Sequence, residues 1–354
     1  MRKLIPILVI TFLVYLTVAY LSTPVANFDA QSYKQIGELT LKEINIYPDP
    51  AISRHPYLPL FLYLEAGALF LSRIVRIPQT LILKCFFSLF HLLSVYIIYH
   101  LSRKNTKTTL LYALNPVSLL IIAFHGQFDI IPLFLILSSI LLLRKKKFTA
   151  VMTSLGLAVT LKTWPILFIV PFLKRIPKKY WAWFFAPPFV FFLLYSVFFH
   201  ASFFSIARVL LVYQGVGGIW GLGKLLSFIS TSKIFLFCYK MLFVTGMLVY
   251  SFKQKKKLIV EELFELIFLF FIFTPGFGIQ WFLWLIPFFF LTKKPMVFSL
   301  FVPIIITLGV VYISWIYPHV ISKNAISLIF LGTFCIFLIY RLYLFFIMKY
   351  RKYM

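Results

Sequence analysis

Apolar runs of about twenty residues recur along the whole chain and are separated by short polar stretches. A run of this length crosses the hydrocarbon core of a bilayer as a helix, because a spanning segment must satisfy its own backbone hydrogen bonds there. The pattern predicts an all-α polytopic membrane protein that forms a single membrane domain over residues 1–354. The first run, Leu4–Leu21, is longer than the apolar region of a typical signal peptide and lacks a small-residue cleavage site, so we interpret it as a retained helix.

Lysine and arginine occur in short clusters between the apolar runs, and they account for the net charge of +26. Because cytoplasmic loops carry the excess of basic residues, we place both termini and all the clusters in the cytoplasm. The clusters are Arg2–Lys3, Arg103–Lys107, Arg144–Lys147, Lys174–Lys179, Lys253–Lys257, Lys293–Lys294 and Lys349–Lys352. About twelve transmembrane helices satisfy this placement; they are expected near residues 4–21, 79–101, 109–124, 128–143, 148–162, 163–174, 181–199, 233–252, 258–274, 280–292, 296–316 and 325–346.

The basic charge therefore marks loops that face anionic headgroups, and membrane lipids rather than nucleic acid are the expected partners. The protein is expected in the cell membrane. The cysteines Cys85, Cys238 and Cys335 lie singly in apolar runs, and this spacing predicts neither a disulfide framework nor a metal site.

Two long segments remain on the outer side in this topology, residues 22–78 and 200–232. The apolar stretch Pro56–Leu71 of the first segment carries Glu65 and is followed by Arg73 and Arg76. These features favour amphipathic juxtamembrane helices at the outer interface over another span. Most of the acidic residues also fall on the outer side, namely Asp29, Glu38, Glu43, Asp49, Glu65 and Asp129. Ionisable groups near membrane depth are functional candidates because burying them is costly.

The segment Asn27-Phe28-Asp29-Ala30-Gln31 follows the first helix directly. A carboxylate at the edge of the bilayer is partly desolvated, which is expected to raise the pKa of Asp29 and make it a competent general base. An equally good interpretation is that Asp29 caps the start of a juxtamembrane helix.

The turn His125-Gly126-Gln127-Phe128-Asp129 is a dense polar island between two apolar runs. Its imidazole, amide and carboxylate can hydrogen-bond a sugar or a phosphate, although an ordinary Asp/Gly turn would look similar. Lys162, in Leu161-Lys162-Thr163-Trp164-Pro165, falls on the same side. Its ammonium needs an anionic partner such as a lipid phosphate, unless it snorkels to the headgroups. Gln280 and Trp284 offer a further hydrogen-bonding amide and a stacking indole.

In order and spacing, these stretches together with Arg54-His55-Pro56-Tyr57-Leu58-Pro59-Leu60 resemble motifs of the GT-C superfamily of polyprenyl-phosphate-sugar-dependent glycosyltransferases. The likeness is to the endoplasmic-reticulum glucosyltransferases of the N-glycan pathway and the first mannosyltransferase of GPI synthesis. It covers roughly residues 20–290. Relatives often carry two acidic residues in the first motif, whereas this chain has Asn27 where the first would fall.

The resemblance implies an inverting transfer of a hexose, mannose ahead of glucose, from a polyprenyl- or dolichyl-phosphate carrier to a lipid-linked glycan or similar acceptor at the extracytoplasmic face. Asp29 would be the general base, and Lys162 would hold the carrier phosphate with help from Arg54 or His55. The sugars would contact Gln31, His125, Gln127 and Asp129, and Gln280 with Trp284 would line the pocket. No cofactor or metal is expected beyond the lipid-phosphate sugar donor.

Two other function classes fit the same composition. A flippase for lipid-linked sugars should show internal repeats and charges near the midplane of broken helices; we find no convincing repeat, and the polar groups gather on one face. A non-catalytic membrane subunit is the third interpretation, and Asn27 is the one feature that favours it.

Overall fold

The computed structural model describes residues 2–25, 27–48, 55, 57–212, 216–217, 219–227, 229, 232–254, 257–292 and 300–350. Helices dominate the described chain, in the order α1 (Leu4–Leu21), α2 (Phe28–Leu41), α3 (Pro59–Val75), α4 (Gln79–Leu101), α5 (Thr106–Ala113), α6 (Pro116–Ser118), the π-helical turn η2 (Leu119–His125), α7 (Ile130–Arg144), α8 (Phe148–Leu161), the 3₁₀ segment η3 (Trp164–Phe168), α9 (Ile169–Leu173), the 3₁₀ segment η4 (Lys178–Phe184), α10 (Ala186–Phe199), α11 (Phe203–Val212), α12 (Gly221–Ser227), α13 (Lys233–Lys253), α14 (Ile259–Phe273), the 3₁₀ segment η5 (Ile279–Leu285), α15 (Ile286–Thr292), α16 (Phe301–Ile316) and α17 (Lys323–Tyr350).

The all-α prediction is confirmed apart from one short ladder. The two-residue strands β1 (Val216–Gly217) and β2 (Gly276–Phe277) pair antiparallel, with Val216 opposite Phe277. This ladder joins the segment 200–232, which also holds α11 and α12, to the start of η5. The hydropathy pattern could not indicate it, since strands of two residues each leave no alternation to detect.

Six helical segments of the described chain are long and apolar enough to cross a membrane, which supports a membrane-embedded protein. They are Leu4–Leu21, Gln79–Leu101, Thr106–His125, Lys178–Phe199, Ile234–Lys253 and Lys323–Tyr343. Five further apolar helical segments are shorter, so the arrangement of twelve crossings stays a prediction.

Several expected single helices are broken, and proline accompanies each break. The helix expected near 109–124 is divided into α5, α6 and η2, because Asn115 starts a new helix and its side-chain carbonyl accepts the Ser118 N–H at 2.8 Å. Pro116 follows at the first helical position, where its missing N–H costs nothing. The helices expected near 163–174, 181–199 and 280–292 likewise combine a 3₁₀ segment with an α-helix.

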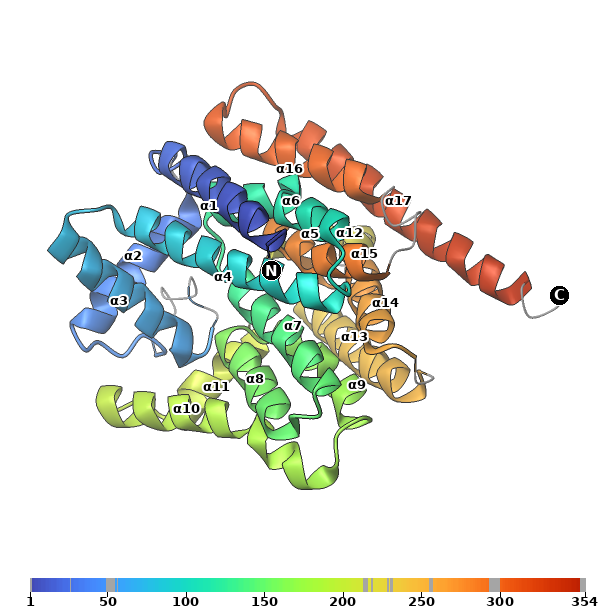
Figure 1. The fold of residues 1–354 in the computed structure, drawn as a ribbon, viewed down its shortest axis with the longest axis horizontal. Coiled ribbons are helices and arrows are strands. Elements are labelled where there is room, and N and C mark those ends of the chain that lie inside the picture. Colours follow the sequence, from blue (N-terminus) through green and yellow to red (C-terminus); the bar gives the residue numbers. More distant parts are fainter. Residues whose placement is uncertain are drawn as a thin grey trace.

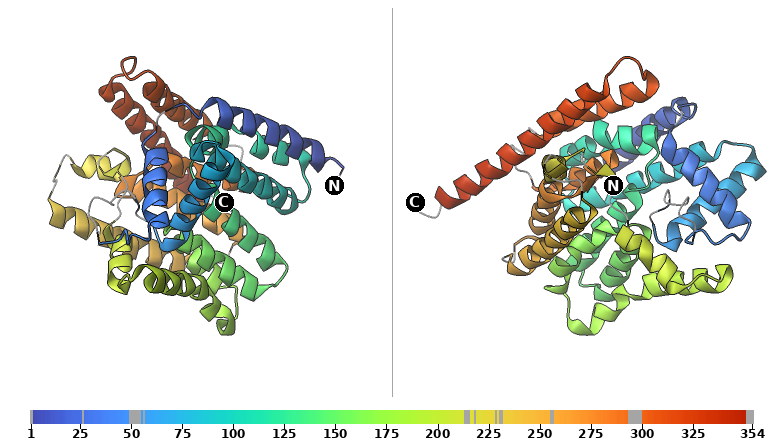
Figure 2. Two further views of the ribbon diagram at one scale, coloured as in Figure 1. Left: turned by 90° about the vertical axis from the view of Figure 1, so that its left-hand side faces the viewer. Right: turned by 180° about the vertical axis from the view of Figure 1, so that it is seen from behind.

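The first expected outer loop contains two helices rather than a span of the bundle. α2 and α3 pack side by side at one edge of the molecule, next to the first half of α4 (Figure 1). α16 and α17 form a hairpin along another side, and the far end of α17 extends beyond the bundle (Figures 1 and 2). The expectation of helices within residues 22–78 is thus confirmed.

The helices α4, α7 and α8 all run between two ends of the bundle that differ in charge and polarity. Their ends at Leu101, Arg144 and Phe148 lie beside basic clusters, and Arg144 donates to the Leu101 carbonyl at 3.0 Å. We call this the basic end. The opposite ends of the same helices lie at Gln79, Ile130 and Leu161. Two of the predicted site residues, Asp129 and Lys162, are next to Ile130 and Leu161. The chain therefore separates its basic clusters from its candidate site along the helix axes.

An ion pair at the basic end joins segments that are far apart in sequence. Arg175, after α9, donates to both carboxylate oxygens of Glu262 in the first turn of α14, at 2.6 and 2.9 Å. Glu262 is fully buried, and its carboxylate also accepts the Lys257 backbone N–H. A bidentate arginine satisfies a buried carboxylate that would otherwise be costly.

Close packing of α8 against η4 depends on Gly156. A Cβ at Gly156 would lie 2.3 Å from the Phe184 carbonyl oxygen, so Gly156→Ala forces the two segments apart. We expect a loss of about 1–3 kcal/mol of stability, measured as a lower Tm in detergent. Gly246→Ala in α13 is the matched control: a Cβ there meets nothing within 4 Å, and alanine favours helix over glycine. An equal Tm for both variants would contradict this packing.

Candidate functional site

Asp29 lies in the first turn of α2 and is held there by two side chains from a distant turn. His125 Nε2 lies 3.0 Å from Asp29 Oδ2, and the Gln127 side-chain amide donates to the same oxygen. The two holding groups also contact each other, with 2.9 Å between Gln127 Nε2 and His125 Nε2. The Asp29 side chain remains 35% exposed whereas that of His125 is 1% exposed. Asp29 is therefore fixed in position and still open to a reactant.

Asn27, and not Asp29, caps α2. The side-chain carbonyl oxygen of Asn27 accepts the Ala30 N–H at 2.7 Å, which satisfies one of the free donors of the first turn. Its amide donates to the His125 backbone carbonyl at 2.8 Å. A carboxylate could not make that second bond, because it has no hydrogen to donate. The asparagine at this position thus ties α2 to the turn that holds Asp29, and the capping interpretation of Asp29 is wrong.

The turn after η2 takes its shape from Gly126. This glycine has φ of +82°, a left-handed conformation that side chains disfavour. The Lys84 side chain passes close by, within 3.2 Å of where a Cβ would stand. The Gln127 N–H returns to the Ile121 carbonyl at 3.1 Å. Gly126 thereby lets His125 and Gln127, on either side of it, face Asp29 together.

A second group of the predicted residues forms a buried ion pair. Lys162 Nζ lies 2.7 Å from Asp129 Oδ2, and Trp284 donates through its indole N–H to Asp129 Oδ1 at 2.6 Å. The side chains of Lys162 and Asp129 are 3% and 0% exposed. Lys162 therefore does not snorkel to the surface, and its anionic partner within the protein is Asp129.

Aromatic rings fill the space between the two groups. The Phe128 ring stacks on Phe61 with centroids 3.6 Å apart, and Lys162 Nζ lies 4.7 Å from the Phe128 centroid and 5.2 Å from that of Tyr57. Trp284 stacks on Trp164 with centroids 4.2 Å apart. Ring faces attract a cation, so these rings support the Lys162 ammonium in a region that excludes water.

The electrostatics of Asp29 favour its ionised form. Burial alone would raise the pKa of Asp29, but the hydrogen bond and positive charge of His125, the charge of Lys162 and the bond from Gln127 together lower it. The pKa of Asp29 therefore lies below its usual range, and Asp29 is a carboxylate at neutral pH. The expectation that desolvation raises this pKa is wrong, because the partners of the carboxylate outweigh its burial. The contribution of Lys162 shows that the buried pair acts electrostatically on the exposed acid.

His55 pairs with an acid that the motif comparison did not include. Its Nδ1 lies 3.3 Å from Glu65 Oε2, and both side chains are 1% exposed. Burial raises the pKa of Glu65 to about 7, although the charge and hydrogen bond of His55 oppose this. The His55 ring stacks on Phe61, so this pair borders the same aromatic group as Lys162.

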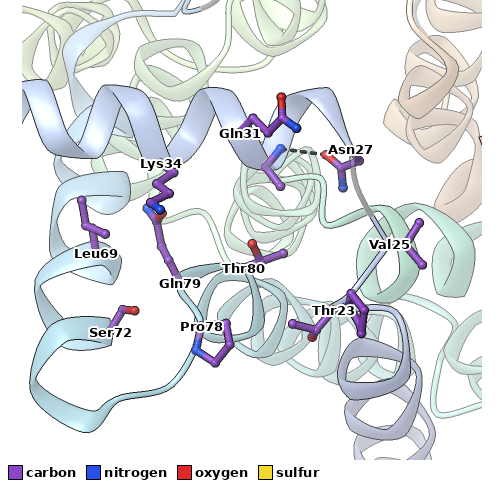
Figure 3. Close-up of a pocket in the computed structure, with 12 residues that line it drawn as sticks. Thr23, Val25, Asn27, Gln31, Lys34, Leu69, Ser72, Pro78, Gln79 and Thr80 are labelled. Atoms are coloured by element: carbon purple, nitrogen blue, oxygen red, sulfur yellow. Dashed lines mark hydrogen bonds between the residues drawn. The ribbon is translucent and has the colours of Figure 1, made fainter.

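Besides His55, two predicted site residues of the described chain are in neither group. Gln31 lies on another face of α2 and lines a separate cavity (Figure 3). Gln280 is half-buried at the start of η5 with its carbonyl oxygen folded over Gly278. Arg54 lies outside the described residues. The structure thus joins Asp29, His125 and Gln127, and separately Asp129, Lys162 and Trp284.

Sequence reasoning missed three residues that complete the site. The Tyr312 hydroxyl lies 3.1 Å from His125 Nδ1, and the Tyr33 hydroxyl lies 3.4 Å from Gln127 Oε1. Lys84 is buried in α4 and donates to the backbone and side-chain oxygens of Ser22 at 3.1 and 2.7 Å. Nothing in the sequence distinguished these two tyrosines from the others in a chain that has 20. Lys84 did, because a lone lysine in a long apolar helix is costly.

Within the described residues, no three side chains of the His, Cys, Asp and Glu types gather as a metal ion would require. Metal independence stays a prediction. No protein-family model matches the chain, and no curated protein matches it either.

Proposed function

We propose that the protein is a membrane glycosyltransferase that moves a hexose, mannose more readily than glucose, from a polyprenyl- or dolichyl-phosphate carrier to a lipid-linked glycan or similar acceptor at the extracytoplasmic face. The observation that carries the proposal is the environment of Asp29. It is a partly exposed carboxylate with a lowered pKa, oriented by His125 and Gln127. It also lies at the end of the bundle opposite the basic clusters.

The proposed reaction needs one proton transfer and one displacement. Asp29 accepts the proton of an acceptor hydroxyl, and the hydroxyl oxygen attacks the anomeric carbon. The bond from that carbon to the phosphate oxygen breaks with its electron pair leaving on the polyprenyl phosphate, so configuration inverts. A positioned general base is worth about 10²–10⁴-fold in rate.

Asp129 and the aromatic rings hold the Lys162 ammonium, so in this proposal Lys162 supports the architecture of the site, and its binding of the carrier phosphate stays a prediction. His125 and Gln127 orient the base. Both side chains are buried, so they act on the reaction through Asp29. Trp284 stacks on Trp164 and donates its indole N–H to Asp129, so the two indoles pack against the ion pair. Interactions prearranged in this way stabilise developing charge without reorganising during the reaction.

The test is a transfer assay on purified protein in lipid, offered mannosyl- and glucosyl-phosphate polyprenols with a membrane-lipid glycan extract. Labelled product with one donor supports the proposal and identifies the sugar. No product with either donor, together with transbilayer movement of a lipid-linked sugar in vesicles, would overturn it in favour of a flippase.

A pH profile tests the orientation of the base. Because the pKa of Asp29 is lowered in the folded protein, the rate should hold as pH falls from neutral and drop only below the usual aspartate value of about 3.9. His125→Leu removes the largest lowering contribution, so the acid limb should move to higher pH. His100→Leu at the basic end is the control. An acid limb that does not move in His125→Leu would contradict this role for the imidazole.

A further inference from the structure

A cavity of about 370 Å³ lies beside the Asp29 group but on another face of α2. It is bounded by the end of α1, the first two turns of α2, the end of α3 and the start of α4 (Figure 3). The mechanism above does not use it. The lining residues are Thr23, Pro24, Val25, Asn27, Ala30, Gln31, Lys34, Leu69, Ser72, Pro78, Gln79 and Thr80.

The lining combines polar and apolar residues, and its charge has one sign. Asn27, Gln31 and Gln79 contribute amides, Thr23, Ser72 and Thr80 contribute hydroxyls, and Lys34 contributes an ammonium. None of the twelve lining residues is acidic. α2, with 14 residues, also starts at this cavity, and a helix N-terminus favours negative charge. The lining therefore suits an anion.

A second lysine, Lys84, lies near the lining of the cavity. Lys84 lies one turn beyond Thr80 in α4 and is 1% exposed. Its ammonium bonds the two oxygens of Ser22, the residue that precedes Thr23 of the lining. Both of these partners are uncharged. Among the described residues no carboxylate pairs with this ammonium, so its charge adds positive potential on this side of the cavity.

The cavity lies next to the end of a segment able to cross the membrane. That segment ends at Leu21, two residues before Thr23 of the lining, and Leu21 is 68% exposed. A cavity that offers an ammonium, amides and hydroxyls in this place suits a molecule with a charged head and hydrocarbon chains.

We propose that this cavity binds the phosphate headgroup of a membrane lipid, with Lys34 as the direct ligand and Gln31 and Thr80 as hydrogen-bond donors. The inference is independent of the transfer reaction proposed above. Asn27 connects the two sites, because it lines the cavity and donates to the His125 carbonyl. A lipid held here therefore lies against the helix turn that carries Asp29.

The experiment measures binding of three lipids to the full-length chain in detergent by native mass spectrometry. Dioleoyl phosphatidic acid and a polyprenyl monophosphate share a phosphate head, and dioleoylglycerol lacks it. We expect saturable binding of one or both phosphate lipids and none of dioleoylglycerol. Preference for polyprenyl monophosphate would identify the carrier as the ligand, and equal binding would identify phospholipid in general. Similar affinity for dioleoylglycerol would overturn the proposal.

Variants separate this cavity from other lipid contacts. Lys34→Gln should weaken binding of the phosphate lipids about tenfold, the loss expected for one charge-assisted hydrogen bond, and Lys34→Arg should retain it. Thr80→Phe, which fills the cavity, should also weaken binding. Lys42→Gln, at the exposed end of the same helix, is the matched control. Asp29→Asn should bind as the wild type does. Unchanged binding in both Lys34→Gln and Thr80→Phe would sink the proposal.

Discussion

Asp29→Asn is expected to remove hexosyl transfer and leave the protein folded. Asparagine has nearly the same shape and still offers an oxygen to the Gln127 amide, but it cannot accept the acceptor's proton. The loss should therefore be about 10²–10⁴-fold in the rate of transfer. The measurement compares labelled product from both proteins at the same concentration, in the same lipid.

The fold should survive because asparagine keeps nearly the same shape and the cap of α2 does not depend on Asp29. Asn27 provides the cap of α2, and the Asp29 side chain is 35% exposed. Tm should stay close to the wild-type value. Glu38→Gln, on the same helix and half-buried, is the matched control and should retain activity. A fully active Asp29→Asn protein would remove Asp29 from the role of base, whatever the reaction proves to be.

Removing one partner of the Lys162–Asp129 ion pair is expected to have the largest effect on stability. Lys162→Met leaves a buried carboxylate whose remaining hydrogen-bond partner among the described residues is the Trp284 indole. Asp129→Asn leaves a buried ammonium among aromatic rings. Loss of one partner of a buried pair costs about 3–5 kcal/mol. Each single variant should show a markedly lower Tm in detergent.

The double variant distinguishes a lost charge pair from simple damage to the core. Lys162→Met with Asp129→Asn removes both charges and keeps an oxygen for the Trp284 indole. Because an apolar substitute for a buried ion pair is often nearly neutral, the double variant should recover much of the stability lost by either single one. Additive losses would show that the two residues do not stabilise each other.

The two sets of variants also report on different proposals. Asp29 is exposed and tests the chemistry, while the Lys162–Asp129 pair is buried and tests the architecture that supports it. The lowered pKa of Asp29 links them, since Lys162 contributes to it. A stable Lys162 double variant should therefore show an acid limb at higher pH than the wild type.

The sequence determined the class of fold and the end of the bundle at which the functional candidates lie. Hydropathy and the positions of prolines and basic clusters are local properties, so α1 and α4 begin and end where the pattern predicts, at Leu4–Leu21 and Gln79–Leu101. The same pattern indicated which end of each helix carries the polar motifs.

Only the tertiary structure decided which candidates meet. Asp29 and His125 are 96 residues apart, and Asp129 and Trp284 are 155 apart; such pairs depend on how each helix is rotated about its axis. The same rotation turns Gln31 into a separate cavity although it lies only two residues from Asp29, because neighbouring positions on a helix face different directions. Spacing along the chain records which groups share an end of the bundle, and packing selects the partners.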